Sequence, residues 1–283
     1  MLKQLFSSLP ELVLTTCIWL SLVTPMIYGC EEPNVFEEPE IEPNLVMELT
    51  FDSPEYSTEE KILMNHELIE LAENEGTNSS KGIRVNYVGD DRGSKRIVQN
   101  IRLPRALTEA TLNFKVKFDD GFRFVKGGKL NGLGPLEKVT GGNPIHPNGW
   151  SARIMFKESG KVAPYIYHQD MKGQFGEGNT TSDPVFIPGM WHKVAIYMKI
   201  NNPADTNNGE FQVWIDNELV SEMSGLKYRG NEGSSTLINY ILFSTFHGGS
   251  NPDWAPKDQD GNYTIEKAWF DDIYLYEGKF IKE

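Results

Sequence analysis

The sequence predicts an all-β protein, built as an antiparallel β-sandwich or β-jelly roll with one concave sheet that binds substrate. Three observations support this prediction. Apolar and polar residues alternate with the period of a strand over many short segments. Clusters of turn-forming residues separate these segments, as at positions 89–93. No strand–helix–strand spacing and no internal repeat is present, so two packed antiparallel sheets are expected.

The first strand is expected at residues 45–51, and Pro54 follows it. The next segment fits two interpretations. Ser57 to Glu60 has the order of a capping box, which would begin a helix that stops at Gly76, whereas residues 66–71 alternate like a strand. We favour helix or irregular structure here.

From residue 82 onward the strand pattern dominates. Strands are expected at 82–88, 96–103, 109–118, 151–157, 163–169, 191–200, 210–216, 218–223, 237–246 and 266–277. Within 109–118 the apolar face begins at Leu112, and Asn113, Lys115 and Lys117 lie on the opposite face. A hairpin turn is expected at Asp216 and Asn217.

The N-terminal residues predict export. Residues 1–29 have the pattern of a signal peptide, with Lys3 ahead of an apolar run, and the run is too short for a membrane span. Cys30 ends a stretch like a bacterial lipobox, so the protein is expected to be secreted or to be a lipoprotein on the cell surface or outer membrane. Residues 30–43 form an acidic, proline-rich tether, and residues 44–283 form one domain. Any membrane contact would be through a lipid on Cys30.

The net charge of −13 is unevenly distributed. Residues 31–75 hold fifteen acids and one lysine, whereas residues 81–129 hold twelve Lys and Arg against five acids. Exposed charges are screened beyond about 8 Å at physiological salt, so this local excess of cations matters more than the total charge. The domain can therefore bind an anion. Nucleic acid is not expected as a partner, because no basic aromatic module is present.

Two of the predicted strands place polar side chains in rows. Ser151 and Arg153 alternate on one strand, while Tyr165, Tyr167 and Gln169 alternate on the next. If these strands are neighbours, a guanidinium, a hydroxyl, two phenols and an amide converge on one surface, and Lys129 approaches from the edge. This set fits a ligand that is anionic and rich in hydroxyl groups.

Four short motifs resemble polysaccharide lyase family 14, which includes alginate and glucuronan lyases. They are Lys126 to Leu130, Ser151 to Arg153, Tyr165 to Gln169 and Ser244 to Ser250, in the family's order and spacing. The resemblance implies a β-jelly roll that cleaves uronic-acid polymers by β-elimination, with its catalytic residues at Lys129, Ser151, Arg153, Tyr165 and Tyr167. His247 departs from the pattern, because an aromatic or apolar residue is expected there.

The residue types agree with this chemistry. Removal of the C5 proton of a uronate develops negative charge beside its carboxylate, and Arg153 can bind both carboxylate oxygens. Lys129, Tyr165 and Tyr167 are each candidates for the base or the acid, and Ser151 is interpreted as an orienting hydrogen bonder. Further substrate contacts are expected from Lys115, Lys117, Lys126, Gln169 and His247.

Three other functions are compatible with parts of the sequence. A carbohydrate-binding module would use a stacking platform of Trp150, Trp191, Trp214, Trp254 and Trp269. A glycosidase would need a carboxylate pair from Glu158, Asp170 and Glu177, but no pair stands at alternating strand positions. A serine hydrolase is disfavoured because the Gly-x-Ser-x-Gly motif is absent.

The sequence predicts a monomer that requires no cofactor, with an anionic polysaccharide as its partner. Its acids near the C-terminus fit two interpretations, a structural calcium site and turn-forming residues. They are Asp253, Asp258, Asp260, Asp271 and Asp272. We favour the turn-forming role.

Overall fold

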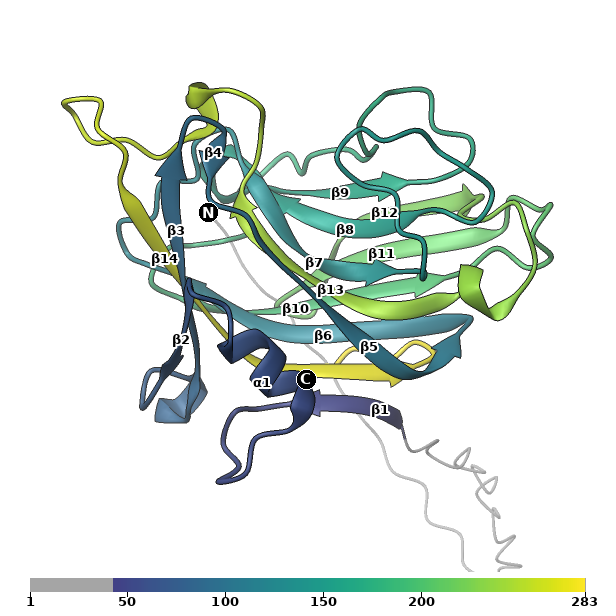
Figure 1. Cartoon of the computed structure of the whole chain (residues 1–283), viewed down its shortest axis with the longest axis horizontal. Helices are drawn as coiled ribbons and strands as arrows, with labels where there is room; N and C mark the ends of the chain where they lie inside the picture. The colour runs from purple at the N-terminus through teal and green to yellow at the C-terminus, as the bar shows by residue number, and fades with distance from the viewer. Residues whose placement is uncertain (1–42, 283) are drawn as a thin grey trace, which may run out of the picture. The chain divides into compact units, whose positions relative to one another are not determined.

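Two antiparallel sheets face each other in the computed structural model, which describes residues 43–282 (Figure 1). The larger sheet runs in the order β12 (Glu218–Leu226), β11 (Gly209–Ile215), β10 (Trp191–Lys199), β6 (Glu109–Phe118), β14 (Ile265–Glu277), β3 (Gly82–Asp90) and β2 (Ile69–Ala72). In addition, β1 (Asn44–Leu49) pairs with β14, and β4 (Gly93–Ser94) pairs with β3. The smaller sheet runs in the order β5 (Ile97–Leu107), β13 (Ile238–His247), β7 (Gly128–Gly134), β8 (Ser151–Phe156) and β9 (Val162–Tyr167).

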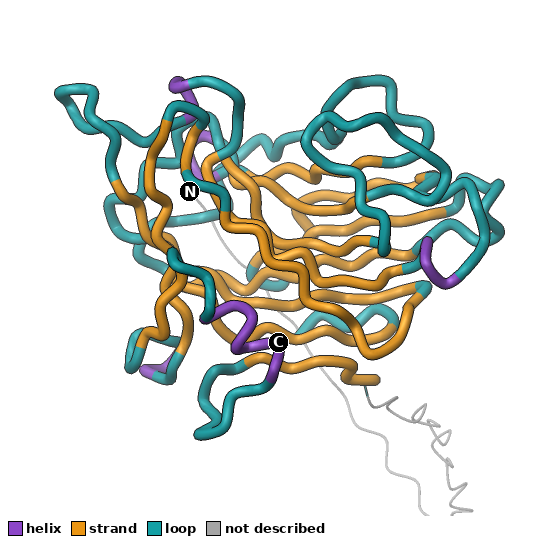
Figure 2. Tube along the Cα trace, viewed as in Figure 1, coloured by secondary structure: helices purple, strands orange, loops and turns teal. Residues whose placement is uncertain are grey.

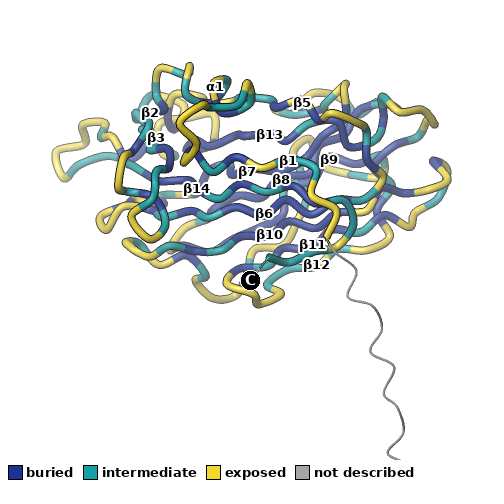
Figure 3. Tube along the Cα trace, turned by 90° about the horizontal axis from the view of Figure 1, so that it is seen from below, coloured by how far each residue is buried: buried dark blue, intermediate teal, exposed yellow. Residues whose placement is uncertain are grey.

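The hydrophobic core lies between the two sheets, and strand alternation explains it. Leu112, Phe114 and Val116 of β6 are buried against the inner face of the smaller sheet, to which β8 contributes Ala152 and Ile154. Figure 3 shows this burial as dark stretches along the strands. The predicted all-β sandwich is confirmed, and loops connect most of its strands (Figure 2).

The ambiguous segment contains both predicted elements in succession. Ser57 and Glu60 form the capping box, and α1 (Thr58–Met64) follows. The helix ends at Met64 instead of Gly76, so that part of the prediction is wrong. The chain then pairs as β2 beside β3, which matches the strand interpretation of residues 66–71.

The central strand β7 was not predicted, because its glycines remove the alternation of side chains. The fold needs these glycines. A Cβ at Gly132 would overlap the carbonyl oxygen of Ala152, and one at Gly128 would overlap the ring of Phe156. Glycine therefore lets β7 lie close to β8, which carries Arg153.

The predicted signal peptide and most of the predicted tether lie outside the described residues. Residues 43–282 form one sandwich that begins at β1. None of their helices has the length and apolar character needed to cross a membrane.

Candidate active site

A groove of about 680 Å³ lies on the outer face of the smaller sheet, away from the core. Strand alternation turns Lys129 of β7, Arg153 of β8 and Tyr165 of β9 into this groove, while their neighbours along each strand enter the core. Register brings the three together, because Arg153 lies directly opposite Tyr165 on the adjacent strand. The sequence predicted that these three face one groove together with Ser151 and Tyr167, and the structure places Lys129, Arg153 and Tyr165 in the groove lining without the other two.

Arg153 is 5% exposed and lies on the groove floor. Its guanidinium carbon is 5.6 Å from the centre of the Tyr165 ring, and its Nε has no hydrogen-bond partner. No carboxylate of the described residues lies within 4.0 Å of it. A buried charge without a partner is costly, so this arrangement favours an anionic ligand at the guanidinium.

Lys129 approaches the same point from β7. Its Nζ lies 3.4 Å from the centre of the Tyr165 ring and 3.2 Å from Met155 Sδ. Burial lowers the pKa of Lys129 well below its ordinary value, and the positive charges of Arg153, Lys157 and Arg96 lower it further. These surroundings favour the neutral amine, which can accept a proton.

Tyr165 lines the groove, and its hydroxyl lies 3.3 Å from that of Tyr167. Burial raises the pKa of Tyr165, and the hydrogen bond to Tyr167 raises it further, whereas the charge of Arg153 acts in the opposite direction. The net shift keeps the phenol protonated. Tyr165 is therefore better suited to donate a proton than to accept one.

Ser151 and Tyr167 share this face of the sheet but lie beneath the loop between β7 and β8. The Ser151 hydroxyl donates to the Val139 carbonyl over 2.7 Å, and the Tyr167 hydroxyl accepts from the Gly142 amide over 2.9 Å. Both side chains are fully buried. In this structure they hold the loop in place, and the Tyr167 ring packs edge-on against the Tyr165 ring.

The five additional residues expected to contact substrate lie elsewhere. Lys115 and Lys117 belong to β6, on the outer face of the larger sheet, because strand alternation does not reveal which sheet a strand joins. His247 lies in the core, where it stacks on Phe122, and its Nε2 is 2.7 Å from the Arg123 carbonyl oxygen.

The other two, Gln169 and Lys126, do not line the groove either. Gln169 donates to the carbonyls of His146, Gly149 and Tyr228 and so fixes the adjacent loops. Lys126 is exposed and forms an ion pair of 2.9 Å with Asp253, at a neighbouring hollow. The placement of His247, Lys115 and Lys117 corrects the expectation of substrate contact in the groove.

The groove contains further cations that the sequence did not single out. Arg96, Lys138 and Lys157 line it together with Lys129 and Arg153, and no Asp or Glu is present among the described lining residues. Arg96 is fixed by the carbonyls of His247 and Gly249. It could have been found by alternation, because it shares parity with Val98 and Asn100, which also line the groove.

The aspartates considered for a calcium site form ion pairs or turn hydrogen bonds in separate places. Asp253 pairs with Lys126, Asp272 pairs with Lys115, and Asp258 accepts from the amides of Asp260 and Asn262 in a turn. Within residues 43–282, no cluster of three or more His, Cys, Asp or Glu residues is arranged to hold a metal ion.

A known protein family matches the part of the chain that builds the groove. The sequence profile described as polysaccharide lyase 14 matches residues 78–266, which is most of the sandwich. The chain belongs to this family. Polysaccharide lyase 14 membership identifies it as a lyase that acts on polysaccharides, and the residues of the groove all lie within the matched range.

Solved structures show the same fold. The alginate lyase Aly36B has a TM-score of 0.64 and 22% identity, covering 84% of this chain and 98% of its own. The marine polysaccharide lyase 14 alginate lyase from Aplysia kurodai has a TM-score of 0.58 and 21% identity, covering 82% and 98%. An endo-β-1,4-glucuronan lyase from the fungus Trichoderma reesei has a TM-score of 0.51 and 15% identity, covering 74% and 86%. Among curated proteins, no sequence matches this chain.

Proposed function

We propose that this polysaccharide lyase cleaves a uronic-acid polymer of the alginate or glucuronan type by β-elimination. The observation that carries the proposal is the juxtaposition of buried Arg153 and half-buried Lys129 in a groove whose described lining residues include no carboxylate. Alginate oligosaccharides are bound in structures of Aly36B variants, which supports the same substrate class.

Arg153 is proposed to bind the carboxylate of the uronate that reacts. A guanidinium binds two carboxylate oxygens at once and stays charged even where burial lowers its pKa, as it does here. Loss of the C5 proton delocalises negative charge onto this carboxylate. A charge already positioned there stabilises the developing anion more than the bound substrate, which is the condition for catalysis.

Lys129 is proposed as the base and Tyr165 as the acid. The neutral amine of Lys129 takes the C5 proton, the electrons of the C5–H bond form the C4–C5 double bond, and the C4–O4 bond breaks. The Tyr165 hydroxyl protonates the departing O4. The opposite shifts of the two pKa values, downward for Lys129 and upward for Tyr165, supply the two protonation states that this step requires.

The groove has room for several sugar units. A second hollow shares Lys157, Thr180 and Trp254 with it, so the depression continues past the reacting residues toward Lys161. Such a continuation supports cutting within the polymer. A polymeric substrate also agrees with the predicted export signal and tether, and we propose a secreted or surface-anchored monomer.

The test is ultraviolet absorbance of the new C4–C5 double bond, measured with polymannuronate, polyguluronate, glucuronan and a neutral polysaccharide. We expect absorbance to rise with at least one uronan and not with the neutral polymer. Arg153→Lys keeps the charge but loses the two-pronged contact, so kcat should fall about 10²- to 10³-fold. New reducing ends without absorbance would indicate hydrolysis and contradict the proposal. Binding without cleavage would support the carbohydrate-binding module instead.

A further inference from the structure

The outer face of the larger sheet carries lysines and aromatic rings in register, on the side of the sandwich opposite the groove. Trp191 of β10 and Trp269 of β14 each lie directly across from Lys117 of β6. The Lys117 ammonium is 5.2 Å from the first ring centre and 4.6 Å from the second. Three adjacent strands therefore carry a tryptophan, a lysine and a tryptophan in one row, in which Trp191 is half-buried and Trp269 is buried with its indole N–H donated to Glu75.

Two residues further along the same strands, Lys193 lies directly opposite Lys115. Like charges in this position destabilise a sheet, so the pair needs an anion nearby. Asp272 supplies one at 2.8 Å from Lys115. No carboxylate of the described residues lies within 4.0 Å of the Lys193 ammonium. Asp216 accepts a hydrogen bond from the backbone amide of Lys193 and not from its side chain.

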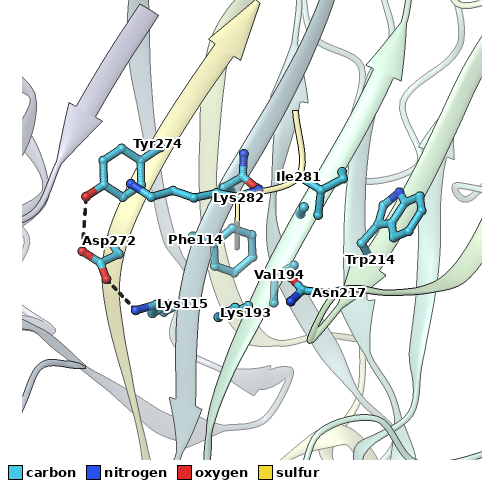
Figure 4. Close-up of a pocket in the computed structure, with 12 residues that line it drawn as sticks. Phe114, Lys115, Lys193, Val194, Trp214, Asn217, Asp272, Tyr274, Ile281 and Lys282 are labelled. Carbon is cyan, nitrogen blue, oxygen red and sulfur yellow. Dashed lines mark hydrogen bonds and ion pairs between the residues drawn. The ribbon is translucent and has the colours of Figure 1, made fainter. Parts of the chain in front are cut away.

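A small hollow of about 50 Å³ opens beside this lysine pair (Figure 4). Trp214 and Asn217 border one side, and Tyr274 and Lys282 border the other. The C-terminal segment that forms part of the rim is fixed to the sheet, because the Asn113 amide donates to the Phe280 carbonyl and accepts from the Lys282 amide. The hollow is thus part of the ordered sandwich.

We propose that this face is a second, non-catalytic binding site for an anionic polysaccharide. The choice of a uronan as its occupant rests on the proposed function. The half-buried rings of Trp191 and Trp214 can pack against the apolar C–H faces of sugar rings. Lys117 and Lys193, which have no carboxylate of the described residues within 4.0 Å, can bind the carboxylates of the polymer. The side chains that alternate onto this face include both tryptophans and lysines. The site would therefore recognise both the apolar ring faces and the carboxylates of a uronan.

The site would hold the enzyme on its polymer while the groove cuts. Once one site has bound a polymer chain, the same chain is present at a high effective concentration near the other site. A long polymer can engage both faces, whereas an oligosaccharide of a few sugars cannot span them. The proposal therefore predicts an effect on long chains alone.

The experiment compares two charge reversals on the same strand and the same face. Lys193→Glu changes the hollow, while Lys199→Glu changes a lysine that is already paired with Glu210 at 3.6 Å. Both lower the net charge by the same amount, so a general electrostatic effect is identical in the two. Each is made in a Lys129→Ala background to prevent cleavage, and retardation in gels cast with polymannuronate, glucuronan or a neutral polysaccharide is measured.

We expect Lys193→Glu to weaken the affinity for the uronan, measured from the retardation, about three- to tenfold, and Lys199→Glu to have little effect on it. Trp214→Ala should weaken it as well. In the otherwise unchanged enzyme, Lys193→Glu should leave turnover of a uronate tetrasaccharide unchanged. Equal losses in both lysine variants, or none in either, would overturn the second site while leaving the lyase intact. If the Lys129→Ala protein is not retarded and the wild type yields no unsaturated ends, the proposed function itself fails and the second site fails with it.

Discussion

Lys129 Nζ lies 3.4 Å from the centre of the Tyr165 ring, so the proposed base and the proposed acid are in contact before substrate arrives. After elimination Lys129 carries the extra proton and Tyr165 lacks one, so a cation and a phenolate then lie side by side and attract each other. The return of a proton to Tyr165 and the loss of one from Lys129 complete the cycle.

The two tyrosines should differ in their effects. Tyr165→Phe removes the proposed donor but keeps the ring, so kcat should fall about 10²- to 10⁴-fold while tetrasaccharide affinity changes little. Tyr167→Phe removes the hydrogen bond to Gly142, so we expect a loss of stability of about 0.5–1.5 kcal/mol and a smaller loss of kcat. Steady-state kinetics and urea unfolding of both variants check this. A larger kcat loss in Tyr167→Phe would assign the acid to Tyr167.

The pH profile should respond to Lys157. Burial is the largest cause of the lowered pKa of Lys129, and the charge of Lys157 is a smaller one. Lys157→Gln should therefore raise that pKa in part and move the acid limb of kcat/KM to higher pH, because the base acts as the neutral amine. Lys161→Gln is the control, since Lys161 is not among the charges that shift Lys129. An unchanged acid limb in Lys157→Gln would argue against Lys129 as the base.

Gly132 should tolerate no side chain. Gly132→Ala places a Cβ against the Ala152 carbonyl and 2.5 Å from Arg153 Cα, so we expect a loss of about 1–3 kcal/mol in the free energy of unfolding and a fall in kcat. Gly121→Ala is the control, because no atom lies within 4 Å of its added Cβ. Urea unfolding distinguishes them. Equal stability of the two variants would contradict the close approach of β7 and β8.

Trp254 should contribute to binding of long substrates. It borders the groove and also the neighbouring hollow, which none of the reacting residues lines. Trp254→Ala should raise KM for polymer about tenfold, equivalent to about 1.4 kcal/mol, with kcat unchanged. KM for a trisaccharide bound at the reacting residues should stay constant. A loss of kcat with both substrates would instead place Trp254 in the catalytic step.

His247 should make the fold sensitive to acid. Burial lowers the pKa of His247 to about 4. As the pH is lowered from about 6.5 to 4, the unfolded chain takes up a proton that the folded chain does not. The free energy of unfolding therefore decreases as the pH falls through this window. The loss amounts to about 3 kcal/mol. Unfolding of wild type and His247→Gln at pH 7 and pH 4 should show about that much less acid loss in the variant.

The sequence predicted most strands because alternation is a local signal that survives without knowledge of the partners. It placed Arg153 and Tyr165 on one surface for the same reason. It did not place Lys115 and Lys117, because the sheet that a strand joins is decided by packing of distant segments. It missed β7, where glycine carries no side chain to alternate. His247 was within reach, since it shares parity with the buried residues Phe243 and Thr245.

The five residues that the family resemblance implies to be catalytic have two different positions in the structure. The resemblance grouped Ser151 and Tyr167 with the other three, but their hydrogen bonds to Val139 and Gly142 depend on a loop whose path the sequence does not specify. Irregular loops show no periodic alternation of apolar and polar residues, so the sequence does not predict their contacts. Such residues are recognised as supports only when the loop is seen.

The absence of carboxylates among the described groove residues affects the product as much as the substrate. Elimination breaks the C5–H and C4–O4 bonds and leaves every uronate carboxylate in place, so the fragments contact the same cations as the polymer. We therefore expect departure of the fragments to limit the cycle when few mobile ions are present. Added salt screens the half-buried lysines of the groove more than the buried Arg153, so it should loosen the ends of a fragment while the reacting unit stays bound. Ionic strength should set how many cuts follow one encounter with the polymer.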